Sequence, residues 1–549
     1  MKSLFSRSNS SSPAPAGWSL CGLVAALLAG GIAHASDARD TAREAERLLS
    51  GWQQAAAARV LAPYESQADP PPDIAYVLAR LAFVRGQYAQ AEKRIDEALK
   101  ASPDRGAWQS LRAVIRSTRG AVAGYHEARS KDGRVVVRYE AGKDAVLVPF
   151  VLLAMDAIVR EIGGDFGFVA EEPILVELYP SAETLAKVSP LTEKDIERTG
   201  TIALCKYQRL MVTTPRALLR GYAWLDTLAH EFVHYAVTKL SNNTVPIWLH
   251  EGLAKWEERR WRGAITRRLQ PTAEHLLAQG LQKKKLITFE QMHPSMAKLP
   301  SQEDAGLAFA EVYTVIDYIH GKVGLAGIRE VLGLMRAGKS DADAIAAVMK
   351  QSFAAFKKAW MAYLRGLKLN LHPGIVADKL HFKKKGKKKR DELRDITSEQ
   401  ARDFTRLGEH LRQRNHVRAA AIELGKAVKL AKNRFPMIQN KLARVLLDLR
   451  EPREAVATLL PTLELYPSYP STHLYLGEAY LALGEVDRAI TAFEETIRQN
   501  PFNPRPHEAL WDLYRRKNDA EGAERAARSL RVLKGESGDD PWAPVSTLP

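Results

Sequence analysis

The sequence has little cysteine and no long apolar run beyond its first 35 residues. Two cysteines in 549 residues are too few for a disulfide framework or for a zinc cluster held by cysteines. No interior stretch is apolar enough to span a bilayer, which takes about 20 such residues in a row. The basic stretches lack interleaved aromatic residues and no known nucleic-acid-binding motif occurs, so nucleic acid is not an expected partner.

The composition is typical of a globular protein, with 46% hydrophobic and 26% charged residues. A chain of 549 residues exceeds what one hydrophobic core supports. Domains usually have about 100–200 residues, so three or four domains are expected. The net charge of +16 agrees with affinity for anionic surfaces and equally with a solvated basic exterior.

The N-terminus has the three parts of a secretory signal peptide. Basic residues come first, residues 20–32 form a short apolar core, and residues 33–35 (A-H-A) form a cleavage site. We therefore expect cleavage of residues 1–35 after Ala35 and an exported protein, periplasmic or secreted. Cleavage would also remove Cys21 and leave a single thiol, so the fold needs no disulfide.

Small residues recur every 34 positions in the C-terminal part of the chain. The alanines with this spacing are Ala421, Ala455, Ala489 and Ala523. Pro467 and Pro501 are also 34 apart, and the best copy of the repeat runs from Tyr475 to Pro501. Small residues at this period let paired helices cross closely, and proline closes each unit. The pattern resembles the tetratricopeptide repeat and predicts about four helical hairpins in a solenoid over residues 400–534.

One unit of the same kind lies near the N-terminus, from Tyr76 to Asp104. Ala57 precedes Ala91 by 34 positions, which indicates a second, weaker unit. We assign residues 37–128 to a short helical domain that resembles the tetratricopeptide repeat.

Residues 129–370 lack the repeat and mix strand and helix signals. Residues 134–139, 174–179 and 201–213 are rich in β-branched and apolar residues and are predicted strands, and residues 146–162 are a predicted helix. The third of these strands is the expected edge of the sheet. The remainder of the segment is α-rich, so the domain is predicted to be α+β.

A basic stretch separates this domain from the C-terminal repeats. Six lysines and one arginine fall within residues 383–390. We predict a solvated linker over residues 371–399, which would make the repeat block a separable unit. Docking of the basic run onto an anionic envelope surface is the alternative. Residues 535–549 are left as a C-terminal tail.

The motif HEFVH places His230 and His234 four positions apart. On a helix they share a face, so both imidazoles can meet one ion, while Glu231 can hold a water on the open side. A stable zinc site needs a third protein ligand. Glu251 lies 17 residues after His234, beyond a predicted turn that would let a second helix run back. His250 is the competing ligand, although it points about 100° away from Glu251 on a helix.

HExxH followed by WLxEGxA at residues 248–254 resembles the gluzincin metallopeptidases. It is similar in particular to their peptidase-MA-like branch, which often comes joined to tetratricopeptide repeats. The resemblance covers about residues 129–370, with a specific core at residues 224–258. It implies a multidomain chain with an α+β zincin-like metallopeptidase domain, flanked by α-helical repeats, that holds one zinc ion per chain. The site residues that it implies are the zinc ligands His230, His234 and Glu251 and the general base Glu231.

The resemblance is weaker at the group that stabilises the oxyanion. Gluzincin aminopeptidases place a tyrosine just upstream of a helix similar to residues 308–324, where this chain has Phe309. Phenylalanine has no hydroxyl to donate to an oxyanion. Tyr313, one helical turn later, is the candidate for the role, and His320 is the alternative.

Two functions fit these patterns. The first is an exported zinc-dependent metallopeptidase, or another amide hydrolase, that acts on a peptide or protein substrate and binds protein partners through its repeats. The second is an envelope assembly scaffold built on the repeats, with a vestigial or non-proteolytic metal domain. An intact HExxH with Glu231 favours the first function. The repeats suit both, and no pattern in the sequence identifies the substrate.

Overall fold

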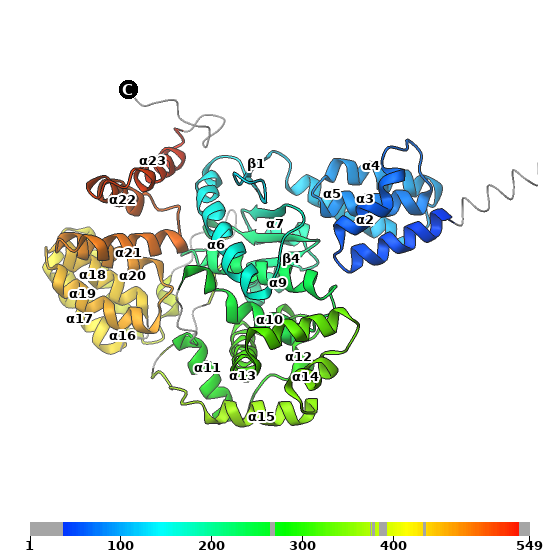
Figure 1. Cartoon of the computed structure of the whole chain (residues 1–549). Coiled ribbons are helices and arrows are strands. Elements are labelled where there is room, and N and C mark those ends of the chain that lie inside the picture. The colour runs from blue at the N-terminus through cyan, green and yellow to red at the C-terminus, as the bar shows by residue number, and fades with distance from the viewer. Residues whose placement is uncertain are drawn as a thin grey trace, which may run out of the picture.

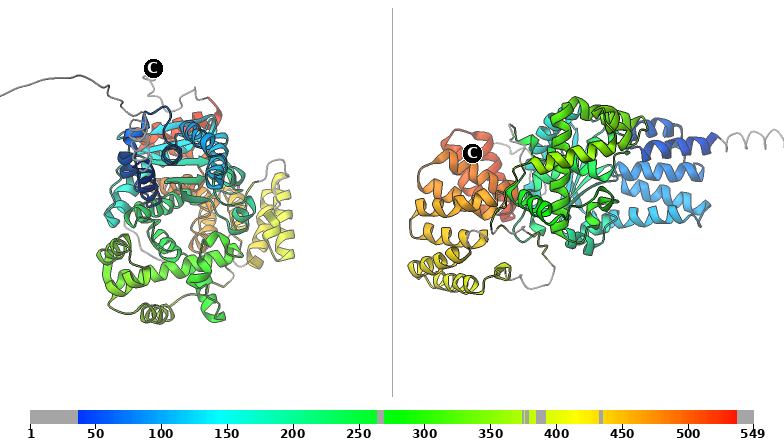
Figure 2. Two further views of the ribbon diagram at one scale, coloured as in Figure 1. Left: turned by 90° about the vertical axis from the view of Figure 1, so that its right-hand side faces the viewer. Right: turned by 90° about the horizontal axis from the view of Figure 1, so that it is seen from below.

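A computed structural model describes residues 37–263, 269–373, 375, 379–383, 392–431 and 435–536. The predicted signal peptide, most of the basic run and the end of the C-terminal tail lie outside these residues. The N-terminal repeat and the C-terminal solenoid lie on opposite sides of a central α+β domain (Figures 1 and 2). The predicted multidomain architecture is thus present. Among the described helices, none has the length and apolar character that crossing a membrane requires.

The N-terminal repeat is a stack of helices in which each packs on its neighbours. The 34-residue spacing has a packing reason, because Ala57 and Ala91 are both fully buried where helices cross. The helices are residues 37–50, α2 (Gln54–Glu65), α3 (Pro72–Val84), α4 (Tyr88–Ala101) and α5 (Gly106–Ala121).

The central domain is built on a five-stranded mixed sheet with the order β1-β2-β3-β5-β4. The strands β2, β3 and β5 run parallel, and the antiparallel strands β1 and β4 form the two edges. The strands are β1 (Tyr125–Arg129), β2 (Val135–Glu140), β3 (Ile174–Tyr179), β4 (Ala203–Lys206) and β5 (Arg209–Thr213).

Alternate residues of the strands face two different layers. Ile174, Val176 and Leu178 of β3 belong to the main core, which α6 (Val148–Phe166) and α9 (Trp224–Leu240) cover. On the opposite face, Glu177 accepts a hydrogen bond from Tyr88 Oη of α4 at 2.5 Å. The sheet is therefore enclosed between the helices of its own domain and the N-terminal repeat.

The prediction of one strand over residues 201–213 was wrong, because this segment is a hairpin. Tyr207 and Gln208 have positive φ angles of 54° and 58°, and they reverse the chain between β4 and β5. Two-residue hairpin turns need positive φ and usually carry asparagine or glycine. Neither residue type is present at these positions, so the turn has no local signal. Of the two hairpin strands, β4 lies at an edge of the sheet, while β5 lies between β3 and β4.

The rest of the central domain is helical, as its composition predicted. Its longest helix, α13 (Gln302–Arg336), changes direction at Gly324, whose φ of 63° is not helical. The other helices are α7 (Ala182–Val188), α8 (Glu193–Thr199), α10 (Ile247–Glu257), α11 (Pro271–Lys283), α12 (Phe289–Met292), α14 (Asp341–Met349) and α15 (Phe353–Gly366).

The C-terminal solenoid consists of four helical hairpins, as the repeat spacing predicted. Ala455 and Ala489 are fully buried, and a Cβ on Gly477 would come within 2.7 Å of the Phe493 ring. Small residues are thus required where the helices cross. The helices are α16 (Glu399–Gln413), α17 (Val417–Ala431), α18 (Pro436–Asp448), α19 (Pro452–Leu465), α20 (Pro470–Ala482), α21 (Val486–Gln499), α22 (Pro504–Arg516) and α23 (Ala520–Lys534).

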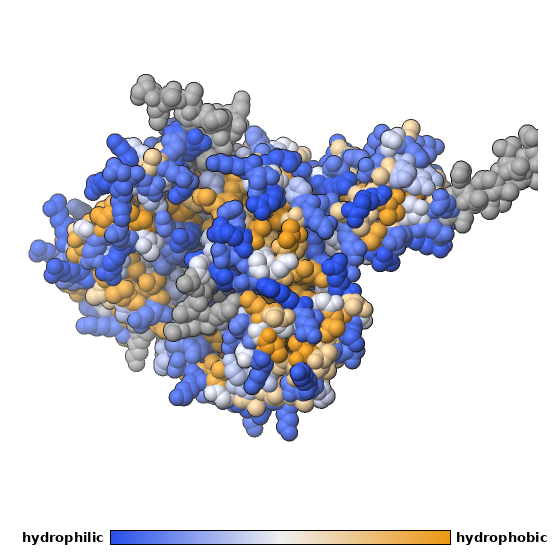
Figure 3. Space-filling model, viewed as in Figure 1, coloured by the Kyte–Doolittle hydropathy of each residue, from blue (hydrophilic) through white to orange (hydrophobic). Residues whose placement is uncertain are grey.

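The solenoid docks on the central domain rather than hanging from a free linker. Trp224, at the start of α9, is fully buried, and its indole N–H points to the Ile497 carbonyl oxygen at 3.5 Å. Part of the predicted linker also contacts the central domain, since Lys383 N donates to the Ala217 carbonyl oxygen at 2.7 Å. The surface seen in Figure 3 is mostly hydrophilic, with apolar patches over the central domain. Separation of the repeat block would expose apolar surface on α9.

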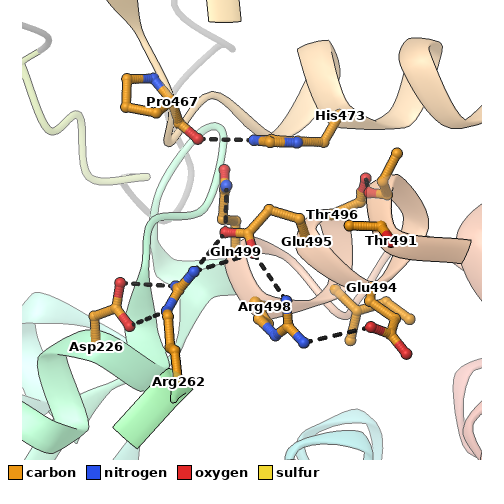
Figure 4. A network of polar contacts seen from close by, with 12 residues as sticks. Asp226, Arg262, Pro467, His473, Thr491, Glu494, Glu495, Thr496, Arg498 and Gln499 are labelled. Carbon is orange, nitrogen blue, oxygen red and sulfur yellow. Dashed lines mark hydrogen bonds and ion pairs between the residues drawn. The ribbon is translucent and has the colours of Figure 1, made fainter. Parts of the chain in front are cut away.

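A network of ion pairs completes this interface (Figure 4). Arg262 donates to Asp226 of α9 at 2.6 and 2.7 Å and to Glu495 of α21 at 3.1 Å. Burial raises the pKa of Glu495, but the positive charges of Arg262 and Arg498 outweigh burial and lower the pKa to about 2. The guanidinium therefore links two largely buried carboxylates from two domains.

We expect Arg262→Ala to destabilise the docked solenoid, because Asp226 and Glu495 would lose their shared cation. Removing one partner of a buried pair costs about 3–5 kcal/mol, and the loss is measurable as a lower unfolding midpoint in urea. Arg488→Ala is the control, since Arg488 is an exposed residue of α21 that pairs with Glu485. Equal shifts for the two variants would contradict this role of Arg262.

The effect of Arg262→Ala should depend on pH. The pKa of Glu495 lies below its ordinary value of 4.5 in the folded protein. A depressed carboxylate pKa stabilises the fold above the unfolded pKa, and this stabilisation is lost as the pH falls through the folded pKa. The difference between wild type and variant should thus be full at neutral pH and shrink between about pH 4.5 and 2.

Candidate metal centre

The first two histidines of the site lie on α9, as predicted. The helix is apolar around the motif, and Ala229, Phe232 and Val233 are fully buried. This packing fixes the helix against the sheet and leaves His230 and His234 partly exposed on one face. Their ring centroids are 4.7 Å apart, and the rings are nearly perpendicular, at an interplanar angle of 85°.

The third residue comes from α10, which follows a short loop after α9. Asn242 and Asn243 in this loop have positive φ angles, which lets the chain turn back sharply. Gly252 allows α10 to lie close to α13, since a Cβ there would come within 2.9 Å of the Val312 carbonyl oxygen. The tight crossing holds the neighbouring Glu251 toward α9.

His230, His234 and Glu251 are brought together in one group. Glu251 Oε2 lies 3.2 Å from His230 Nε2 and 3.3 Å from His234 Nε2. One potential ligand atom from each residue lies within 4.8 Å of the other two. Both imidazoles therefore present the same nitrogen, Nε2, to one point.

The other ring nitrogens are held by two further residues. Glu258 Oε2 lies 3.3 Å from His230 Nδ1. His250 Nδ1 lies 2.6 Å from His234 Nδ1, and His250 Nε2 lies 3.1 Å from Thr238 Oγ1. If Nε2 of His234 is to bind a metal, its Nδ1–H must donate to His250, which must then donate through Nε2 to Thr238. His250 thus contacts the ring nitrogen of His234 that faces away from Glu251.

The electrostatics of the group are those of a cation site. Burial lowers the pKa of His230, but hydrogen bonds to Glu251 and Glu258 outweigh it and raise the pKa to about 10. Burial raises the pKa of Glu251, yet the charge of His234 and the hydrogen bonds of both histidines hold it well below its usual range. Burial and the charge of His234 lower the pKa of His250 to about 3, so His250 is neutral. The carboxylate is thus stabilised by positive charge in front of it.

Glu231 is buried beside this group and is not one of its three members. Burial raises the pKa of its carboxyl, against the opposing charges of His234 and His230. The backbone of Cys205 on β4 hydrogen-bonds to it. Its Oε2 has no hydrogen-bond partner within the described part of the chain. A buried acceptor without a partner is costly, and a water held at the site would satisfy it.

These residues fit a zinc ion. Two imidazole nitrogens and one carboxylate oxygen are the donor set of catalytic zinc sites, with the fourth position left for water. Glu258 and His250 supply the outer hydrogen bonds that such histidines require. The unpartnered oxygen of Glu231 marks where the water would be held. The assignment of the three ligands and of Glu231 remains a prediction.

The group lies on a cleft of about 920 Å³ that also reaches the edge strand β4. Phe309 of α13 lines this cleft and contacts His230, with ring centroids 6.1 Å apart. Tyr313 is buried, 8% exposed, and is not among the lining residues. His320 is not a lining residue either and packs on Trp256. The placement therefore does not favour Tyr313 or His320 as the oxyanion donor.

Sequence reasoning missed two residues of the site, Glu258 and Lys255. Lys255 lines the cleft and donates to Glu258 Oε1 at 2.7 Å. Its ammonium lies 5.9 Å from the centre of the Phe309 ring. The signal was present in the helical spacing, because Glu251, Lys255 and Glu258 lie four and seven positions apart on one helix face.

Comparison with known families agrees with this fold. A family model described as Peptidase MA superfamily matches residues 153–366, which contain the metal group. The central domain is a Peptidase MA superfamily domain. Two tetratricopeptide-repeat models match residues 52–115 and 440–504. The chain thus joins a Peptidase MA domain to tetratricopeptide repeats on both sides, as the sequence motifs predicted.

Among solved structures the similarities are distant. MamA from Desulfovibrio magneticus is 21% identical over 25% of this chain and 78% of its own, with a TM-score of 0.23. A thermophilic tetratricopeptide-repeat protein of Thermus thermophilus is 23% identical over 25% and 75%, with a TM-score of 0.23. Yeast LTA4 hydrolase in complex with bestatin is 14% identical over 74% and 67%, with a TM-score of 0.30. No curated protein matches this chain.

Proposed function

We propose that the protein is a zinc-dependent peptidase whose repeats bind protein partners or substrate. The observation that supports it most is the convergence of His230, His234 and Glu251 beside the buried Glu231, on a cleft that borders a free strand edge. The Peptidase MA match supports a peptidase, and the tetratricopeptide repeats support protein binding.

Glu231 is the proton carrier in this proposal. When bound, a zinc ion supplies Lewis-acid chemistry and lowers the pKa of a water toward about 7. Glu231 lines the cleft, and its Oε2 has no hydrogen-bond partner among the described residues, so it can accept a proton from the attacking water and pass it to the leaving amine. Burial, which raises the pKa of this carboxyl, brings it closer to the pH at which it must take and release a proton.

The edge strand β4 is the proposed binding surface for the substrate backbone. All four of its residues line the cleft, and it pairs on one side with β5. An extended peptide can add to the other side through main-chain hydrogen bonds. Because the Cys205 amide meets Glu231, the proposed position of the scissile bond is near the middle of β4.

Lys255 is the proposed donor to the oxyanion, because Phe309 has no hydroxyl and Tyr313 lies outside the cleft lining. Removing an oxyanion donor costs about 10²–10³ in kcat, so Lys255→Met should lower kcat by that factor while zinc stays bound. Tyr313→Phe should leave kcat unchanged. Because Lys255 also pairs with Glu258, which contacts His230, Glu258→Gln is the control for an indirect effect on His230. A loss with Tyr313→Phe and none with Lys255→Met would reverse this assignment.

The test of the function is metal analysis of the purified mature protein together with a peptide-library cleavage assay. We expect about one zinc per chain and cleavage that a chelator abolishes. Zinc binding without cleavage of any peptide would favour the scaffold function. The absence of a hydroxyl at Phe309 agrees with that function. In that function the repeats bind partners and the metal domain does not turn over.

We also propose that the protein is exported, on the evidence of the A-x-A site before residue 36. N-terminal sequencing of the protein from its native host should begin at Ser36. Partners are proposed to bind the solenoid, where a cavity of about 230 Å³ opens between Arg220 of the central domain and Asn440 of α18. The basic run at residues 383–390 would add attraction to an anionic envelope surface.

A further inference from the structure

The cleft is not formed by the Peptidase MA domain alone. Its lining includes Leu49, Ser50 and Trp52 from the first interhelical turn of the N-terminal repeat, together with Arg80 and Val84 of α3. We call residues 49–53 the repeat turn. A module expected to bind partners therefore supplies part of the wall of the active-site cleft.

The repeat turn bridges the two sides of the cleft at one end. On the sheet side, Gln208 Nε2 of the β4–β5 hairpin donates to the Leu49 carbonyl oxygen at 3.4 Å. On the helix side, Gln53 Nε2 donates to Asn242 Oδ1 at 2.8 Å, and the Trp52 ring packs on Tyr235 of α9 with centroids 5.9 Å apart. The turn thus spans from the end of β4 to the loop between α9 and α10.

The repeat that carries the turn is fixed to the sheet through Tyr88 of α4, whose hydroxyl joins a buried ion pair of the sheet. Arg209 and Glu177 are both fully buried, with Arg209 Nε 3.2 Å from Glu177 Oε2. Arg209 Nη1 also donates to Tyr88 Oη of α4 at 2.6 Å. Breaking such a buried network is strongly unfavourable. The wall is therefore held in place and does not swing aside like a loosely tethered domain.

The position of the wall gives a length limit. Cys205 meets Glu231, and three residues further along the chain Gln208 meets the repeat turn. β4 stays extended for one residue beyond Cys205, to Lys206, before Tyr207 and Gln208 reverse the chain. Extended chain advances about 3.3 Å per residue, so about one or two substrate residues fit between the scissile bond and the wall. Antiparallel pairing is the more stable arrangement for a strand added to β4. The residues toward the wall are then those on the N-terminal side of the scissile bond.

We infer that the repeat turn makes this protein a peptidase for substrates with a short N-terminal side, which removes about one or two residues from a free N-terminus and rejects internal sites in long chains. The inference rests on the proposed function and adds the class of substrate to it. The repeats then act as a selectivity wall in addition to any partner binding.

The test uses a peptide from the library that the full-length protein cleaves, extended at its N-terminus to give one, two, three, five and eight residues before the scissile bond. We expect kcat/KM to fall at least about tenfold beyond two residues. Trp52→Ala should raise cleavage of the longer peptides relative to that of the shortest. Trp511→Ala is the matched control, since this exposed tryptophan lies on α22, far from the cleft.

Equal cleavage of all lengths by the wild type, or a limit that Trp52→Ala does not relax, would overturn the inference. Arg80→Ala opens the same wall at a part-exposed ion pair with Glu46 and serves if Trp52→Ala does not fold. Binding of the same peptides to Glu231→Gln, by fluorescence polarisation, separates the two proposals. Length-limited binding without any cleavage would contradict the peptidase function and support the length limit set by the repeat turn. Cleavage without a length limit would support the peptidase function and contradict the length limit.

Discussion

Glu231→Gln is expected to keep its zinc and to lose turnover by at least about 10²–10⁴-fold. Glu231 is not one of the three residues whose ligand atoms converge, so the metal should stay. Glutamine keeps nearly the same shape but cannot accept a proton from the water. The buried oxygen that has no partner in the described structure would become either an amide oxygen or an N–H, and neither serves as a base.

The measurement is zinc content beside kcat on the best library peptide. Glu303→Gln makes the same chemical change at another cleft-lining carboxylate, which lies exposed on α13, and should keep full activity. Rescue of a deletion strain by Glu231→Gln distinguishes the peptidase function from the scaffold function. If Glu231→Gln, with its zinc in place, rescues the strain fully, the peptidase proposal fails and the scaffold stands.

The repeats and the metal motif were predictable because each depends on short-range spacing. Helices in a tetratricopeptide array touch only their neighbours, so a 34-residue period of small residues carries the packing directly. Likewise, His230 and His234 share a helix face whatever the rest of the fold does. The proximity of Glu251 to the two histidines required one further inference, that the chain turns back toward α9, and this turn lies at Asn242 and Asn243.

What the sequence did not reveal depends on contacts between distant segments. The β4–β5 turn at Tyr207 and Gln208 has none of the usual turn residues, and Phe83 of the N-terminal repeat packs on Tyr207 with ring centroids 5.1 Å apart. The docking of Arg262 on Glu495 joins residues 233 positions apart. No local pattern encodes either contact. The burial of Tyr313 could not be read from the sequence for a related reason, since one turn along α13 separates it from Phe309, which lines the cleft.

These long-range contacts change how the repeats should be regarded. The N-terminal repeat meets the sheet through the hydrogen bond of Tyr88 with Arg209 and lines the cleft with Trp52. The C-terminal solenoid meets the start of α9 at Trp224. The helix that carries both histidines is therefore held between the two repeat domains. A partner that binds either repeat would act close to the metal group without touching it.

Glu251→Ala is expected to empty the metal site, whereas His250→Ala should only weaken it. Glu251 Oε2 is the atom that lies within 3.3 Å of both His230 Nε2 and His234 Nε2, so its removal leaves two ligands, which do not make a stable zinc site. His250 touches the opposite nitrogen of His234 and is neutral, so its loss removes an orienting hydrogen bond.

Loss of such an orienting partner costs about 10–100-fold in metal affinity, and Glu251→Ala should exceed this range. Competition with a zinc-binding dye gives both affinities, with thermal unfolding as the check that each variant folds. Thr238→Val extends the series by removing the acceptor that fixes the tautomer of His250, and it should give a loss no larger than His250→Ala. If His250→Ala emptied the site while Glu251→Ala kept its zinc, the third ligand would be His250, and the orientation of His234 would need a different explanation.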